Sequence, residues 1–128
     1  MSEEEILESN KLIVEFMGYK YINPKDSCDK WGWYLNEDDS ISELYLKELK
    51  YHSSWSWLMS VVEKISNDPN VLDVGITFNL GCDIYFKNLE IDEVPNCWTE
   101  FEETMIDCVY QSCIKFIKWQ RKRKKTKN

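Results

Sequence analysis

The sequence predicts an α+β fold in which an antiparallel sheet of about four strands packs with three helices, as helix–sheet–helix layers. Three segments repeat apolar residues at helical spacing, a hairpin pattern lies between the second and third, and two other short runs have strand composition. The chain has 128 residues, of which 43% are hydrophobic, enough for one core. We therefore expect a single domain over residues 1–120 and a basic tail over residues 121–128.

The first two predicted helices have clear start and stop signals. A capping box of Ser2 and Glu5 begins the first, which runs over about residues 3–17 and ends at Gly18. The second covers about residues 54–66 and ends at the sequence Asn-Asp-Pro. Its apolar side consists of Trp55, Leu58, Met59, Val61, Val62 and Ile65.

The third predicted helix has the strongest pattern. Thr99 and Glu102 form a second possible capping box just after Pro95, which places the helix start at Thr99. Apolar residues then recur every three or four positions at Phe101, Met105, Val109, Cys113 and Phe116. We expect this helix to form a major wall of the core.

A hairpin is predicted between the second and third helices. Asn79, Leu80 and Gly81 form its turn, between two runs in which apolar and polar residues alternate. The pairs expected from a three-residue loop are Phe78 with Cys82, Ile76 with Ile84, and Val74 with Phe86. All six side chains then share one face, and Asp73 lies opposite Lys87 on the other. Further strands are expected in residues 31–35 and 41–49.

Composition indicates a soluble cytoplasmic protein. The chain has no long apolar run that could cross a membrane, and its acidic start is unlike the basic start of a signal peptide. Free cysteines prefer burial, so we expect Cys28, Cys82, Cys97, Cys108 and Cys113 to be reduced core residues. With one histidine and no Cys-x-x-Cys pair, we expect no metal and no other cofactor.

Three segments resemble small phage and prophage proteins. They are residues 10–18 (NKLIVEFMG), 51–65 (YHSSWSWLMSVVEKI) and 109–119 (VYQSCIKFIKW), together just over a quarter of the chain. The sequence is similar to the group described as phage ABA-sandwich domains. Ser56 and Ser60 depart from it, since relatives often have Asp and Pro there, and the basic C-terminal run is not typical of the group. The resemblance implies a helix–sheet–helix fold and a phage context, and it implies no activity.

Residue patterns argue against an enzyme. No phosphate-binding glycine loop, Ser–His–Asp order or paired-carboxylate motif is visible, and the chain has only four glycines. His52 with Ser53 and Ser54 is the nearest approach to a catalytic group. Helix capping or packing explains these three residues better than catalysis does.

Tryptophans offer a second kind of candidate site. Trp31 and Trp33 alternate on a predicted strand, and core packing explains them better than stacking on bases does. Trp57 and Trp98 fall on no apolar stripe. We therefore expect these two rings to be candidates for a partner-binding surface.

Charge is unevenly distributed along the chain. Six of the 16 basic residues lie in the last eight positions, so residues 1–120 have a net charge of −13 against −7 for the whole chain. A solvated surface with a frayed tail explains this distribution without any function. A functional alternative is an acidic body that binds a basic groove, with candidate contacts at Glu37, Asp38, Asp39, Glu100, Glu102 and Glu103.

Three functions follow from these patterns. The first is a phage accessory protein that binds a host protein, one form of which is an inhibitor of a nucleic-acid-binding defence nuclease (anti-CRISPR-like). The second is a nucleic-acid-associated protein that contacts RNA or DNA weakly through Arg121, Lys122, Arg123, Lys124, Lys125 and Lys127. The third, an uncharacterised small enzyme, has the least support.

Overall fold

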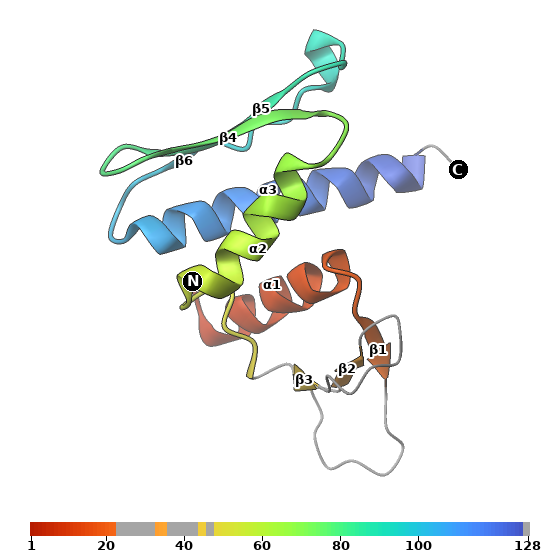
Figure 1. Ribbon diagram of the computed structural model, residues 1–128, viewed down its shortest axis with the longest axis vertical. Coiled ribbons are helices and arrows are strands. Elements are labelled where there is room, and N and C mark those ends of the chain that lie inside the picture. Colours follow the sequence, from red (N-terminus) through yellow and green to blue (C-terminus); the bar gives the residue numbers. More distant parts are fainter. Residues whose placement is uncertain (23–32, 36–43, 46–47, 127–128) are drawn as a thin grey trace. The chain divides into compact units, whose positions relative to one another are not determined.

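A computed structural model describes residues 1–22, 33–35, 44–45 and 48–126 of the chain (Figure 1). Contacts group the chain into two compact units, Met1–Tyr51 and His52–Asn128. The predicted domain boundary at residue 120 falls inside helix α3 (Met105–Thr126), which continues without a break into the basic segment. That segment is therefore helical as far as Thr126, where we expected a frayed tail.

The first unit opens with helix α1 (Glu3–Phe16). The predicted capping box is confirmed: the Glu5 N–H donates to Ser2 Oγ at 3.1 Å, and the Ser2 N–H donates to Glu5 Oε1 at 3.3 Å. Gly18 has a φ of 98°, the left-handed backbone predicted after the helix end. Strands β1 (Lys20–Ile22), β2 (Trp33–Leu35) and β3 (Leu44–Tyr45) follow and pair in that order.

The second unit combines two helices with a second sheet. Its elements are α2 (Trp55–Ser66), β4 (Val71–Thr77), β5 (Gly81–Phe86), the short 3₁₀ helix η2 (Ile91–Glu93), β6 (Thr99–Glu100) and α3 (Met105–Thr126). The sheet is antiparallel with the order β4-β5-β6. Both helices lie on one side of it (Figure 1), where α2 contacts β4, and α3 contacts β5 and β6.

The α+β class is confirmed, but the predicted sheet is not. We expected one sheet of about four strands, and the described residues form two antiparallel sheets of three strands each. Strands β3 and β6 have only two residues, too few to show the alternation that identifies a strand in a sequence. The helix–sheet–helix layering stays a prediction.

The hairpin exists, but its predicted register is wrong. The loop comprises residues 78–80, and the observed pairs are Thr77 with Gly81, Ile76 with Cys82, Val74 with Ile84, Asp73 with Tyr85, and Val71 with Phe86. Asn79, with a φ of 64°, supplies the left-handed position in this loop, where we assigned the turn to residues 79–81. Phe78 therefore lies in the loop, and Asp73 faces Tyr85 rather than Lys87.

The predicted start of the third helix is also wrong. Thr99 and Glu100 form β6, which pairs with β5, so Thr99 and Glu102 are not a capping box. Helix α3 begins at Met105, and Thr104 Oγ1 accepts the Asp107 N–H at 3.2 Å. The Thr99 hydroxyl is instead buried in contacts with Ser112 and Lys115.

Helix α3 forms the main wall of the core, as predicted. Its buried side chains are Met105, Cys108, Val109, Tyr110, Ser112, Cys113, Ile114, Phe116 and Ile117. The Phe116 ring stacks on Phe86 of β5, with ring centroids 6.1 Å apart. Trp55 and Met59, assigned to the apolar stripe of α2, are exposed. Among the described residues, no helix has the length and apolar character needed to cross a membrane.

Candidate binding surfaces

Three of the six predicted acidic contacts lie together at one end of the second unit. Glu100 ends β6, while Glu102 and Glu103 lie in the connection to α3, and all three side chains are exposed. Glu37, Asp38 and Asp39 lie outside the described residues.

Two large apolar side chains lie next to these carboxylates, at the tip of the β4–β5 hairpin. Phe78 is 71% exposed and Leu80 is 58% exposed. The backbone at the tip is anchored, because the Phe101 N–H donates to the Leu80 carbonyl at 3.0 Å. The Asn79 N–H also lies 3.3 Å from Met105 Sδ. These contacts hold the hairpin tip against the segment between β6 and α3.

Trp98 extends this apolar surface over β5. A Cβ added at Gly81 would lie 2.3 Å from Trp98 Cη2, so the indole ring covers the glycine directly. The ring remains 39% exposed. We call the combined area the hairpin-tip surface; it comprises Phe78, Leu80, Trp98, Glu100, Glu102 and Glu103. Trp57, the other predicted ring, is half-buried on α2 and is not part of this surface.

A buried polar network fixes β6 beneath the hairpin-tip surface. Ser112 Oγ lies 2.8 Å from both the Cys97 carbonyl and Thr99 Oγ1, and 3.0 Å from the Cys82 carbonyl. Ser112 Oγ is the donor toward each of these three oxygens, and its one hydroxyl proton serves one of them at a time. The network therefore connects α3, β5 and the start of β6.

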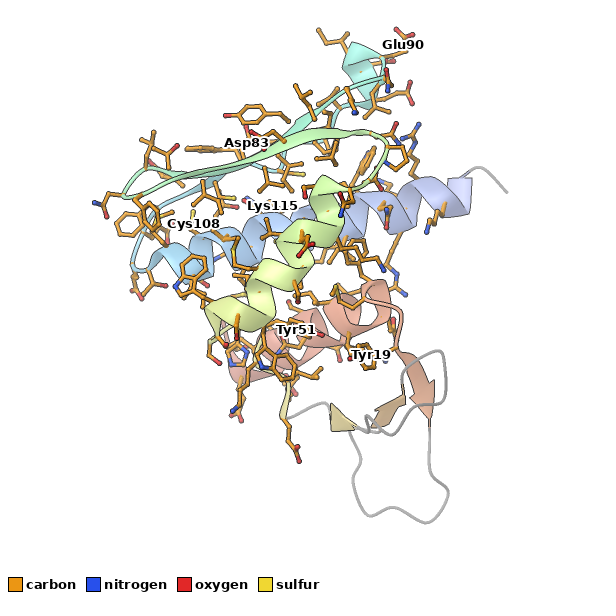
Figure 2. The ribbon with its side chains drawn as sticks, in the orientation of Figure 1. Tyr19, Tyr51, Asp83, Glu90, Cys108 and Lys115 are labelled. Carbon is orange, nitrogen blue, oxygen red and sulfur yellow. The ribbon has the colours of Figure 1, made fainter. Side chains whose placement is uncertain are left out.

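Lys115 completes the network from α3. Its Nζ donates to the Trp98 carbonyl at 2.5 Å and to Thr99 Oγ1 at 3.0 Å. Lys115 lies between α3 and the sheet (Figure 2). Hydrogen bonds from an ammonium group are stronger than neutral ones, so this residue holds the backbone of Trp98 in place.

Four cysteines lie in the core, as predicted. Cys82, Cys97, Cys108 and Cys113 are free and buried, and Cys28 lies outside the described residues. Burial raises the pKa of Cys82 to about 11 and that of Cys97 to about 12, and it also raises the pKa values of Cys108 and Cys113. A thiol with a raised pKa stays protonated near neutral pH, which makes it a poor nucleophile.

His52 and Ser54, for which helix capping or packing was expected rather than catalysis, lie at the start of α2. The His52 ring packs edge-on against Tyr110 at 6.2 Å, and burial lowers the His52 pKa. Ser54 is the N-cap residue of α2, although its side chain makes no capping hydrogen bond. In the part of the chain that the structure describes, no three His, Cys, Asp or Glu side chains are grouped so as to hold a metal ion.

The basic C-terminal residues form a second candidate surface, on the last turns of α3. Arg121, Lys122 and Lys124 are exposed, Arg123 is half-buried, Lys125 lies within the helix, and Lys127 lies outside the described residues. At about 100° per residue, Lys115, Lys118 and Lys122 fall within about 60° of one another around the helix. These three lysines therefore lie on one face of α3, and the other basic residues lie around its C-terminal end.

Sequence reasoning missed the two apolar residues of the hairpin-tip surface. We paired Phe78 with Cys82 in the core and treated Leu80 as a turn residue. The sequence did contain a signal for this surface: Phe78 and Leu80 flank Asn79 in the turn, whereas turn residues are usually polar.

No family model, curated protein or solved structure matches this chain. The resemblance to phage ABA-sandwich domains therefore stays a prediction.

Proposed function

We propose that this protein is a phage-encoded accessory protein that acts without catalysis, by binding a host protein through the hairpin-tip surface. One observation carries the proposal: Phe78, Leu80 and Trp98 remain exposed together beside three carboxylates, on a backbone that hydrogen bonds hold in place. Exposed large apolar side chains that cluster with a polar rim are typical of protein interfaces.

The charge of the surface indicates what kind of partner it fits. Glu100, Glu102 and Glu103 form an acidic rim, and the whole chain has a net charge of −7. Opposite charge on a partner would speed association and orient the two proteins, while the apolar centre would supply most of the affinity. A basic protein surface is therefore the best complement. A nucleic-acid-binding nuclease of the host is one protein with such a surface, and inhibition of it is the specific form of the proposal.

The experiment compares matched surface variants in affinity capture from host lysate treated with nuclease. Phe78→Ser should reduce retention of the captured protein about tenfold or more, as removal of an interface anchor does. Glu102→Lys with Glu103→Lys should slow association, most strongly at low salt. Ile91→Ser and Glu63→Lys are the controls, because both residues are exposed and lie outside the hairpin-tip surface.

Two results would contradict this proposal. One is that the parent protein retains no specific protein once nuclease has removed nucleic acid. The other is that the control variants weaken retention as much as the hairpin-tip variants do.

A second candidate function is nucleic-acid binding by the basic end of α3. The observation that favours it is the helical conformation as far as Thr126, which places cations on successive turns. Deletion of residues 121–128 should abolish binding to single-stranded DNA or RNA while the protein stays folded. At roughly −0.7 per phosphate contact, six contacts would give a log–log salt slope of about −4 for the parent. Binding that survives the deletion, or that ignores salt, would rule this function out.

A further inference from the structure

A groove in the second unit combines an aromatic ring, two cations and two carboxylates. It lies between η2 with the two residues that follow it and the C-terminal half of α3, and its volume is about 380 Å³. The lining residues are Asp92, Glu93, Val94, Pro95, Trp119, Lys122 and Arg123. This volume is at the lower end of the range of small-molecule sites, which is roughly 300–1,000 Å³. The groove thus suits one small ligand unit.

Contacts inside the groove fix its aromatic and cationic groups. The Trp119 ring packs edge-on against Phe86, with centroids 5.3 Å apart, and lies 5.8 Å from the Phe116 ring. Arg123 Cζ lies 5.3 Å from the centroid of the Trp119 ring, a cation–π distance. The indole is therefore held by the core on one side and covered by a guanidinium from α3.

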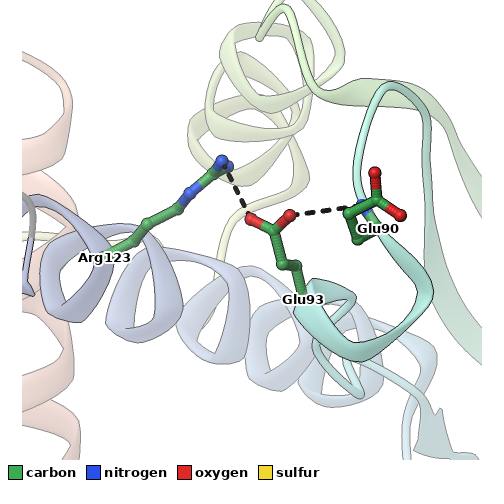
Figure 3. Close-up of polar contacts among 3 residues, drawn as sticks. All are labelled: Glu90, Glu93 and Arg123. Atoms are coloured by element: carbon green, nitrogen blue, oxygen red, sulfur yellow. Dashed lines mark hydrogen bonds and ion pairs between the residues drawn. The ribbon is translucent and has the colours of Figure 1, made fainter.

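Glu93 holds Arg123 in this position. Its Oε2 lies 3.4 Å from Arg123 Nη2, and its Oε1 accepts the Glu90 N–H at 3.3 Å (Figure 3). Both carboxylate oxygens of Glu93 thus have partners, which makes Glu93 a positioning residue. Asp92 brings an exposed second carboxylate to the rim of the groove.

We infer that this groove binds a nucleoside monophosphate unit. The phosphate would be held by Lys122 and Arg123, because cations bind phosphate oxygens through charge-assisted hydrogen bonds. The base would stack on the Arg123 guanidinium that covers Trp119, since every nucleobase has a flat π face and arginine stacks on such faces. Its amino group would donate to Asp92, as the N4 amino group of cytosine does to acidic side chains.

The two carboxylates decide between this ligand and a simple anion. Asp92 and Glu93 repel the negative charge of any phosphate, and so does the overall net charge of −7, so charge alone does not favour a simple anion here. A nucleotide offsets this repulsion with its ring and its amino group. The inference goes beyond the proposed function, because the groove shares no residue with the hairpin-tip surface.

The test is calorimetric titration of the full-length protein at low salt with CMP, UMP, cytidine, inorganic phosphate and a short oligocytidylate. CMP should bind more tightly than UMP, which has an oxygen where CMP has the amino group. Cytidine and inorganic phosphate should each bind at least about tenfold more weakly than CMP, since each lacks one of the two anchors. Asp92→Asn should reduce the difference in affinity between CMP and UMP.

A matched pair of lysine variants separates the groove from general electrostatics. Lys122→Gln should weaken the affinity for CMP about tenfold, the usual loss for one charge-assisted contact. Lys124→Gln removes the same charge from the same helix, at a residue that does not line the groove, and should leave CMP binding unchanged. Both lysines are exposed, so both variants should fold.

The outcomes also identify the source of the ligand. Binding of free CMP that depends on Lys122 indicates a free nucleotide, while binding of the oligocytidylate alone with the same dependence indicates a nucleotide within a strand. The inference is overturned if neither ligand binds, if inorganic phosphate binds as well as CMP, or if Lys124→Gln has the same effect as Lys122→Gln. These results leave the hairpin-tip proposal unaffected.

Discussion

Gly81 and Gly75 both lie in the β4–β5 hairpin, but a methyl group added at each would meet different neighbours. At Gly81 it would lie 2.6 Å from the Thr99 carbonyl oxygen and 2.3 Å from Trp98 Cη2. At Gly75 it would lie 2.7 Å from the ring edge of Tyr85, a side chain that is about half exposed. Tyr85 can rotate away into solvent, whereas the backbone of β6 cannot.

We predict that Gly81→Ala destabilises the protein by about 1–3 kcal/mol, the usual effect of forcing an extra methyl group into a packed site. Gly75→Ala should change the free energy of unfolding by less than about 1 kcal/mol, because replacing a strand glycine offsets the cost of moving Tyr85. Denaturant unfolding followed by circular dichroism measures both. Equal effects of the two substitutions would show that Trp98 does not pack on Gly81 as described.

At the scale of single elements, the sequence predicted which segments form helices better than where they begin. The capping box of Ser2 and Glu5 was correct because only local hydrogen bonds decide it. Thr99 with Glu102 shows the same pattern, yet Thr99 pairs with Cys82 and bonds to Ser112, which is 13 residues away. A local rule cannot anticipate such a contact, so the start of α3 was placed too early.

The hairpin shows the same limit. Alternation correctly put Ile76, Cys82 and Ile84 on one face, because moving each partner by two positions leaves the faces unchanged. The position of the turn decided which residues pair across the two strands. The left-handed residue of the loop is Asn79 rather than Gly81, and the lack of a side chain at Gly81 makes room for Trp98. Phe78 is exposed because the loop comprises residues 78–80 rather than 79–81. The sequence pattern alone therefore did not predict the hairpin-tip surface.

The two ends of α3, in the second unit, carry opposite charges. Glu102 and Glu103 precede the helix, and the basic residues lie on its last turns; the 22 residues of the helix span about 33 Å at 1.5 Å per residue. Acidic groups before a helix and basic groups at its end also stabilise the helix dipole, so part of this pattern serves the fold. The exposed apolar groups beside the acidic end are not explained by the dipole.

The buried thiols make the stability of the whole molecule depend on alkaline pH. In the unfolded chain each thiol ionises near its ordinary pKa of 9.0, while in the folded protein burial raises the pKa of Cys82 to about 11 and that of Cys97 to about 12. Cys108 and Cys113 shift in the same direction. Between pH 9 and 11 the unfolded chain has lost protons that the folded protein keeps. Stability is therefore complete below pH 9 and falls as the pH rises through this window.

We predict that the melting temperature is nearly constant from pH 7 to 8.5 and decreases steeply above pH 9, with each thiol contributing about 1.4 kcal/mol per pH unit. Cys113→Ala lowers stability at every pH but should make the alkaline slope shallower by one proton. Thermal unfolding under reducing conditions from pH 7 to 11 measures both effects. At pH 8, a thiol reagent should react slowly with the four described cysteines in the folded protein and rapidly with all five cysteines in denaturant. A flat stability profile up to pH 10.5, or rapid modification of several thiols in the folded protein, would show that these side chains are not buried together in the core.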